Sequence, residues 1–490
     1  MAISYSDIPA SILVPGSYVE IGSSTARRGI YEMPSRVLLI GQKHAGSPAT
    51  PGVPFLFSGP ATVEAQCGHG SMLHRMAIAV RAANVYSETW AIPLEDDGSG
   101  VAATGTLEFT GTTSGAGTLN VYIGGRRVRI AVASGTTAAA VATALAAAIN
   151  ADTSLAVTGS AGSGAVTATA RHKGEVGNDI DIRVNYYAGE FMPPGLSVDV
   201  TPMSGGSGNP DIGNAISALG GTWYTDVICP YTDSANLALI EAEAAARNGP
   251  LVMQDMAIYT ALSGTYSQLN TWASTRNSRF LFALGMAAAP SMIEEISSAY
   301  GGVCSFHSLA DPARPLQTLP LPGILPPSPS DRFIFGERDV LLRNGIGTTL
   351  ADDGGVVRIE RAVSTHTTDE FGIADATWRD LETMKATAWL RYQRRAFIFS
   401  NYLSKRVKLA ADGTRVSAGQ SLVTPSLIRA DGIAQFRRWE ELGIVQNVDA
   451  WKDGYIVEIA ADDPSRVNEL IPPIMVGGLR VTATLINISL

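Results

Sequence analysis

The stretch YTDVICPYTDSANLALIEAEAAARNGPLVMQD, residues 224–255, decides the fold class. Residues 224–229 form a short apolar run typical of a buried strand, and residues 234–247 have helical composition and end before Gly249. Residues 250–255 predict a second strand, so the segment indicates a βαβ unit. The alternation continues with one more helix and one more strand, over residues 266–276 and 279–284. We therefore expect an α/β core in a chain of mixed α/β (α+β) class.

Two segments nearer the N-terminus have the same character. Residues 36–41 (RVLLIG) are continuously apolar before a glycine, which is typical of a strand buried on both faces. Residues 62–84 predict one helix, with an apolar face formed by Met72, Met76 and Val80.

Between residues 96 and 208 the composition changes to Gly, Ala, Thr, Ser and Val. Four segments alternate like half-exposed strands: residues 105–110, 117–123, 126–132 and 164–170. Residues 136–151 predict a Thr-capped helix that lies on this sheet through the row Val141, Leu145 and Ile149. Residues 205–211 are rich in Gly, Ser, Asn and Pro, which is typical of a connection between domains. We therefore expect that the chain leaves an inserted, outward-facing domain here.

The C-terminal third alternates turns with longer helices. Residues 352–355 (DDGG) predict a hairpin turn between residues 346–351 and 356–365. A long helix is expected over residues 375–403, and a second over residues 425–442 with Thr424 as its N-cap. The remaining expectations are a hairpin at Asp412 and Gly413, a strand over residues 454–460 and a short helix ending at Leu470.

Both ends of the sequence have the character of extended arms. Residues 479–490 (LRVTATLINISL) predict a β-strand, and a terminal strand persists only if its backbone pairs with another edge. Residues 1–21 are apolar and β-branched but are broken by Pro9 and Pro15, which predicts an extended arm. Two such ends suggest assembly before they suggest catalysis.

Charge and composition exclude several classes of partner. The 490 residues carry a formal net charge of −9 without a block rich in Lys and Arg, which argues against nucleic acid and anionic membranes. No stretch reaches the roughly 18 apolar residues of a membrane span, and no signal peptide is evident. Cys67, Cys229 and Cys304 lie far apart, which argues against disulfides and zinc and favours a reducing cytoplasm.

The usual signatures of catalysis are missing from the sequence. It has no P-loop, no H-E-x-x-H, no G-x-S-x-G and no strand-to-helix G-x-G-x-x-G. The spacing of His69 and His74 does not place them cleanly on one helical face, as metal ligands require. Arg391, Arg394 and Arg395 are expected to form a solvated face or a salt bridge between subunits. We expect no catalytic residue, no cofactor and no metal.

Five separated segments carry a resemblance to a known family. They are IPASILVPGSYVEI (8–21), HKGEVGNDIDIRVNYY (172–187), ADPARPLQTLPLPGI (310–324), LVTP (422–425) and FRRWEELGIV (436–445). With them the chain resembles, in order and over almost its whole length, the tail sheath proteins of Mu-like contractile-tailed phages.

The resemblance implies a structural subunit, not an enzyme, that stacks in six-fold rings around a tail tube. Contraction of such a sheath drives the tube through the host envelope for genome delivery. The implied partners are further copies of the chain, the tail tube protein, and baseplate and tail terminator proteins, with no nucleic acid and no membrane insertion. The implied location is the virion tail, after assembly in the host cytoplasm.

In this family the terminal arms pair as strands with neighbouring subunits. The organisation implied here is an N-terminal arm (1–25), a first part of the core (26–95), an inserted protruding β-rich domain (96–208), the continued core (209–477) and a C-terminal arm (478–490). The matching arm positions are Ile3, Tyr5, Ile8, Ile12, Val14, Val19, Ile21, Val481, Ala483, Leu485, Ile486, Ile488 and Leu490. Candidate hinges, where the arms meet the body, are Gly16, Gly22, Gly29, Gly477 and Gly478.

Two alternatives stay open at this point. The chain is compatible with another structural component of a tail or baseplate. It is also compatible with a tail-associated enzyme that degrades the cell envelope, which would need a pair of carboxylates in a cleft.

Overall fold

The computed structural model describes residues 31–415 and 420–488. It divides into two compact units. We call Pro34–Ala388, together with the segment that starts at Gly477, the large unit, and Trp389–Val476, together with residues 31–33, the small unit. The boundary falls within helix α9 (Leu381–Ile398). The following arm and hinge candidates lie outside the described residues: Ile3, Tyr5, Ile8, Ile12, Val14, Gly16, Val19, Ile21, Gly22, Gly29 and Leu490.

An eight-stranded sheet forms the centre of the large unit, in the order β15-β14-β13-β12-β11-β1-β3-β2. The strands from β3 to β14 pair in parallel, whereas β2–β3 and β14–β15 are antiparallel pairs. The strand expected at residues 36–41 is β1, and it is buried after its first residue, as a central parallel strand requires. The bounds are β1 Arg36–Gln42, β2 Phe55–Phe57, β3 Glu88–Leu94, β11 Asp226–Ile228, β12 Ala257–Ser263, β13 Leu281–Met286, β14 Ile346–Ala351 and β15 Val357–Arg361.

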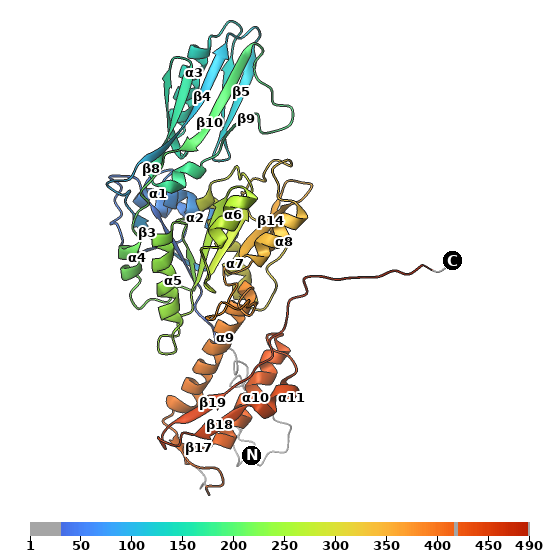
Figure 1. Cartoon of the computed structure of the whole chain (residues 1–490). Helices are drawn as coiled ribbons and strands as arrows, with labels where there is room; N and C mark the ends of the chain where they lie inside the picture. The colour runs from blue at the N-terminus through green and yellow to red at the C-terminus, as the bar shows by residue number, and fades with distance from the viewer. Residues whose placement is uncertain (1–30, 416–419, 489–490) are drawn as a thin grey trace, which may run out of the picture. The chain divides into compact units, whose positions relative to one another are not determined.

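Helices pack against this sheet (Figure 1), and α7 (Ile293–Ala310) lies deep between α2 and β12. Glycines make this packing possible. A Cβ at Gly301 would lie 2.7 Å from Ile228, and a Cβ at Gly302 would lie 2.8 Å from Ala83. The other helices of this core are α1 Pro60–Cys67, α2 Met72–Ala83, α4 Gly213–Ala218, α5 Ser234–Asn248, α6 Tyr266–Ala273 and α8 Phe335–Arg343.

Two expectations for this core are wrong. Residues 250–255 form a turn and loop, in which Leu251 is 93% exposed and Met253 has a φ of +55°, so the next strand, β12, begins only at Ala257. The single helix expected over residues 62–84 is two helices, α1 and α2. Gly68 and Gly70 take φ values of +95° and +72° and turn the chain between them.

Residues 102–204 form two antiparallel sheets around a hydrophobic core of their own. The sheet orders are β10-β4-β8-β7 and β6-β5-β9. Helix α3 (Ala138–Ala151) is capped by Thr137 and buries the expected row of Val141, Leu145 and Ile149 in this core. The strand bounds are β4 Ala102–Gly111, β5 Gly117–Ile123, β6 Arg126–Val132, β7 Val157–Gly162, β8 Ala165–Lys173, β9 Ile182–Val184 and β10 Leu196–Ser204, with a 3-10 helix at Glu175–Asp179.

The chain enters and leaves this β-rich region at one place. The Val101 N–H donates to the Ser207 carbonyl at 2.8 Å, and the Ser207 N–H donates to the Val101 carbonyl at 3.1 Å. Gly100 and Gly208 come close beside this bridge, where a Cβ on either would lie 2.8 Å from the other's backbone. The two connections therefore run side by side.

The small unit is built around an aromatic cluster. The Phe436 ring lies 5.1 Å from Trp439, 4.9 Å from Trp451 and 4.9 Å from Tyr455, measured between centroids. Phe436 belongs to α10, which is capped by Thr424, as expected. The elements after α9 are a π-helical turn Phe399–Leu403, β16 Lys408–Leu409, β17 Leu422–Val423, α10 Pro425–Glu441, α11 Val448–Trp451, a 3-10 helix Lys452–Gly454, β18 Ile456–Ile459 and β19 Val467–Leu470.

Three expectations for the C-terminal third need correction. The hairpin at Asp412 and Gly413 is wrong, because β16 and β17 pair in parallel. The short helix ending at Leu470 is instead strand β19, since antiparallel pairing with β18 overrides the local preference. The long helix begins at Leu381, because Asp375 accepts the Thr377 N–H at 2.8 Å in a turn that precedes it.

Candidate functional site

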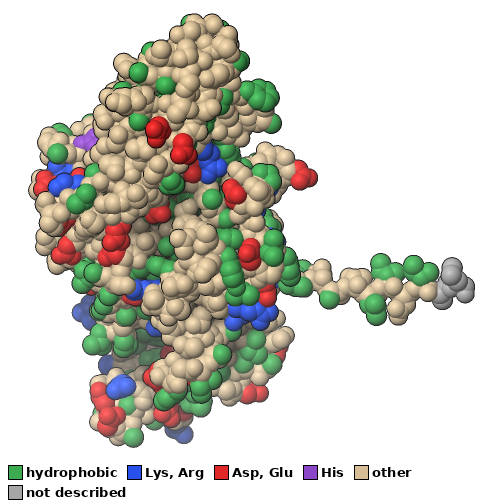
Figure 2. Space-filling model, turned by 45° about the horizontal axis from the view of Figure 1, so that its top comes forward, with side chains coloured by type: hydrophobic (Ala, Val, Ile, Leu, Met, Phe, Trp, Pro, Cys, Tyr) green, Lys and Arg blue, Asp and Glu red, His purple; other side chains and the backbone are tan. Residues whose placement is uncertain are grey.

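The C-terminal segment is an exposed apolar feature of the large unit. Residues 479–488 extend away from the rest of their unit (Figure 1), and apolar side chains line them (Figure 2). Val481, Leu485 and Ile488 are each more than 80% exposed. These ten described residues pair with no strand of their own chain, so the expected terminal strand stays a prediction.

The root of this segment, in contrast, is held by Arg480. One guanidinium nitrogen lies 3.0 Å from each carboxylate oxygen of Glu382 and 3.2 Å from an oxygen of Asp380. The other terminal nitrogen donates to Oε1 of Gln317 at 3.3 Å, and the Gln317 amide donates to the Leu479 carbonyl at 3.1 Å. The Arg480 side chain is 14% exposed and that of Glu382 only 8%. The arm therefore leaves the body from a largely buried ion pair.

The two carboxylates that hold Arg480 are themselves fixed. Asp380 accepts two hydrogen bonds from Arg361, at 2.8 and 2.9 Å, and Glu382 also accepts the Leu316 N–H. Both carboxylates lie at the start of α9, where the helix N-terminus favours negative charge. Each has partners besides Arg480, so the site is preorganised.

The two glycine hinge candidates within the described residues have different surroundings. A Cβ at Gly478 would lie 2.5 Å from Pro315, so the backbone passes close to that ring. A Cβ at Gly477 would meet nothing within 4 Å, and Gly477 lies at the boundary between the two units. A hinge at either glycine stays a prediction.

The small unit presents a second strand feature, the two-stranded antiparallel sheet β18–β19. Among the described residues each of these strands pairs on one side only. Arg394 supports β19 from α9 by bonding both carboxylate oxygens of Glu469, at 2.8 and 2.9 Å, and it also donates to Tyr455. Arg394 is buried, so its expected place on a solvated face or in a subunit salt bridge is wrong.

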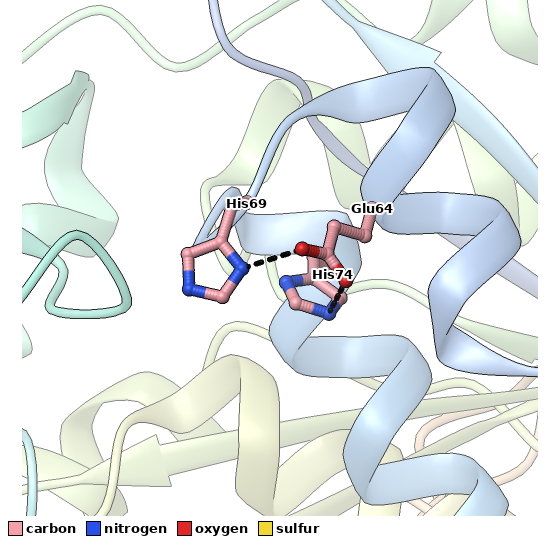
Figure 3. A group of neighbouring side chains, drawn as sticks. All are labelled: Glu64, His69 and His74. Carbon is pink, nitrogen blue, oxygen red and sulfur yellow. Dashed lines mark hydrogen bonds and ion pairs between the residues drawn. The ribbon is translucent and has the colours of Figure 1, made fainter.

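Glu64, His69 and His74 form a cluster between α1 and α2 (Figure 3). Nδ1 of His69 donates to Glu64 at 2.8 Å, and Nε2 of His74 lies 3.8 Å from its other oxygen. Two imidazoles and a carboxylate are a common zinc ligand set, and these ligand atoms lie within 4.8 Å of one another. The spacing of His69 and His74 did not indicate this cluster, because a single helix was expected over residues 62–84.

Hydrogen bonding to His74 nevertheless disfavours a metal. The Gly70 N–H donates to Nδ1 of His74 at 3.0 Å, so the neutral ring carries its hydrogen on Nε2, the atom that faces Glu64. A metal on Nε2 would require that hydrogen on Nδ1, against the Gly70 N–H. The Gly70 backbone packs closely on Thr153, since a Cβ on Gly70 would lie 2.3 Å from the Thr153 carbonyl oxygen. The Gly70 N–H therefore cannot easily move away from His74. The residues present therefore fit a carboxylate that accepts a hydrogen bond from His69 and lies 3.8 Å from Nε2 of His74.

Two more histidines lie where the β-rich region meets this corner. The rings of His44 and His172 stack at 5.0 Å, and His172 accepts the Met72 N–H at 3.2 Å while its other nitrogen bonds Asp96 at 3.1 Å. Burial, followed by the proximity of His172, lowers the pKa of His44 to about 4. Burial also lowers the pKa of His74, although Glu64 acts in the opposite direction. Both shifts favour the neutral imidazole, at His44 and at His74.

The acidic side chains at the start of α7 also serve structure. Glu294 binds Arg75 at 2.7 Å, and Glu295 binds Arg126 at 3.0 Å. Arg126 belongs to β6 of the β-rich region, so the second pair ties that region to α7. These carboxylates have arginine partners, unlike the free pair in a cleft that a glycosidase uses.

Comparison with known proteins gives a consistent result. Residues 98–207 match the family described as phage tail sheath protein beta-sandwich domain, and residues 205–365 match the phage tail sheath protein central domain. The chain is 36% identical over all 490 residues to the Mu-like prophage FluMu tail sheath protein of Haemophilus influenzae, with 100% of both chains covered.

Solved structures of low identity are also similar. The sheath tail protein from Desulfitobacterium hafniense matches with 12% identity and a TM-score of 0.47, covering 94% of this chain and 100% of that one. The sheath of an extracellular contractile injection system, solved in its contracted state, matches with 9% identity and a TM-score of 0.49, covering 98% of each chain. Among the described residues, no helix has the length and apolar character needed to cross a membrane.

Proposed function

This chain belongs to the phage tail sheath family, and we propose that it polymerises in stacked hexameric rings around a tail tube and contracts to drive that tube through the host envelope. It is a structural subunit of a contractile tail, and its relatives bear the names of structural proteins. The proposed result of contraction is genome delivery. The proposed partners are further copies of this chain, the tail tube protein, and the baseplate and tail terminator proteins. The proposed place of assembly is the host cytoplasm, and the proposed final location is the tail of the virion.

The observation that carries the proposal is the exposed apolar segment of residues 481–488. Its Val, Leu and Ile side chains are costly to leave in water unless another molecule covers them. Their extended backbone leaves donors and acceptors in position for a second strand. We propose that this segment is donated to a neighbouring copy.

The proposed acceptor is the β18–β19 sheet of a second copy. A two-stranded sheet is marginally stable alone, and a donated strand would add a third row of main-chain hydrogen bonds. Ile456 of β18 and Leu470 of β19 are exposed side chains that such a strand would cover. Strand exchange of this kind keeps neighbours connected while the lattice rearranges.

Truncation tests the proposal. A variant without residues 481–490, and another without residues 1–24, should fold as judged by circular dichroism but should form no tubes in negative-stain micrographs. A variant that joins Asp96 to Ser207 should still form tubes, because the β-rich region has its own core and its ends lie together. Tubes formed at the wild-type concentration without residues 481–490 would show that the arm is not the link between subunits.

A further inference from the structure

We propose that Arg480 is the positioning residue of the C-terminal arm, a clasp that fixes the arm to the first turn of α9 so that the donated strand starts at Val481. This inference rests on the proposed function and adds to it the residue that sets where the strand begins. It also assigns the contacts through which a pull on that strand is transmitted to the rest of the large unit.

The sequence of the arm singles Arg480 out. It is the only residue with a charged side chain in residues 470–490, within a run that is otherwise apolar or hydroxylic apart from Asn487. An arm that served only as an apolar strand would need no guanidinium. Its neighbours Leu479 and Val481 are 72% and 83% exposed, whereas the Arg480 side chain is only 14% exposed. Arg480 is thus the residue of this stretch whose side chain turns back into the large unit.

The contacts around Arg480 have the geometry of a clasp. The guanidinium meets Glu382 and Asp380 on one side and Gln317 on the other. Charge-assisted hydrogen bonds of this kind are the stronger ones, and planar arginine is suited to bridging two carboxylates. Gln317 also binds the backbone of Leu479, so the residue before the arginine is held as well.

Gly478, two residues before Arg480, has no room for a side chain. Gly478 lies against Pro315, where a Cβ would be 2.5 Å from the ring. From Val481 onward the chain is free to reach about 26 Å through eight extended residues. Fixing the root lowers the entropy that the arm loses when a neighbour orders it.

The clasp also connects the arm to the central sheet. Glu382 and Lys385 lie one turn apart on α9, and the Lys385 ammonium is 2.6 Å from Asp226 on β11. Tension on the donated strand therefore passes through Arg480 and α9 to β11, without depending on the glycines at 477 and 478. A pull from a neighbour would therefore reach the central sheet of the large unit.

Arg480→Gln tests the clasp in the full-length chain, with Arg437→Gln as the matched control. Arg437 is an exposed arginine whose ion pair with Asp449 spans 3.4 Å. We expect Arg480→Gln to raise the critical concentration for tube formation about tenfold, whereas the control should leave it unchanged. A nitroxide on Leu479→Cys should tumble about threefold faster in the Arg480→Gln subunit, because the root is released.

A double variant separates the clasp from a general loss of stability. Glu382→Gln should raise the critical concentration as Arg480→Gln does, and combining the two should add little, because both remove one interaction. Fully additive effects, or wild-type assembly and spin-label mobility in Arg480→Gln, would overturn the clasp. If the variant lacking residues 481–490 fails to form tubes while Arg480→Gln forms them normally, only the clasp is wrong. If the truncated chain itself forms tubes, the proposed function of the arm is wrong.

Discussion

The ammonium of Lys385 lies 2.6 Å from Oδ1 of Asp226, and both residues are buried in the large unit. The Tyr259 hydroxyl donates to the same oxygen at 2.8 Å, and the Thr225 hydroxyl donates to the other at 2.8 Å. This pair joins the start of α9 to the middle of the central sheet. The Tyr259 and Thr225 hydroxyls thus give both oxygens of the Asp226 carboxylate a hydrogen bond, as a buried charge requires.

Removal of one partner of this pair should be costly. Lys385→Met leaves Asp226 charged and without its cation, so we expect the free energy of unfolding to fall by about 3–5 kcal/mol. Chemical denaturation of the unassembled subunit measures this loss. Lys385→Met combined with Asp226→Asn should be more stable than Lys385→Met alone, and a double variant that is less stable would contradict the buried-pair interpretation.

Acid should destabilise the junction between the β-rich region and the α1–α2 corner. The unfolded chain binds a proton on His44 near pH 6.5, whereas burial lowers the pKa of His44 in the fold to about 4. The free energy of unfolding should therefore decrease as the pH falls from 6.5 toward 4 and then level off for this group. His74 contributes with the same sign.

Denaturation curves between pH 7.5 and 4.5 measure this slope. His44→Gln keeps a donor for the His69 carbonyl, which His44 reaches at 3.0 Å, but removes the titrating group. The slope should be smaller in that variant. An unchanged slope would assign the acid sensitivity to other groups.

Zinc should not stabilise the subunit. The Gly70 N–H holds the His74 ring with its hydrogen toward Glu64, which leaves no lone pair for a metal on that side. The melting temperature should be the same with excess zinc and with a chelator. A rise in melting temperature with zinc that His74→Gln abolishes would contradict this reading of the cluster.

Gly432 should tolerate no side chain. A Cβ there would lie 2.5 Å from the hydroxyl of Tyr455, the side chain that Arg394 binds at 2.9 Å. We expect Gly432→Ala to lower the free energy of unfolding by about 1–3 kcal/mol through overpacking. Gly336→Ala is the control, because a Cβ in that helix meets nothing within 4 Å and should stabilise it by about 0.5–1 kcal/mol.

Local patterns predicted the elements whose own residues decide their structure. Strand β1 and helices α3 and α10 follow from a continuous apolar run, an Ala-rich helix with a Thr cap, and a Thr-Pro start. The errors arise where residues distant in the sequence decide the local secondary structure. Strand β19 is a strand because β18 pairs with it, and residues 250–255 form a turn although LVM has strand composition.

The clasp shows why the sequence predicted only one half of the candidate site, the arm, and not the carboxylates that hold it. Residues 479–490 stand out by apolar composition, and Arg480 stands out as their single charge. Its partners Asp380 and Glu382 lie about a hundred positions earlier, among many other acidic residues, so spacing alone does not identify them. The single charge in a mostly apolar run was the signal that the sequence offered.

The paired connections at Val101 and Ser207 have a consequence for how such chains diversify. Two backbone hydrogen bonds close the loop at its neck, and residues 102–204 beyond it supply all but one of the buried residues of their core, the exception being Met292. Any compact domain whose ends lie about 5 Å apart fits the same neck. Residues 102–204 are thus joined to the rest of the chain at one place, and the neck is the position at which a designer can replace them with another domain.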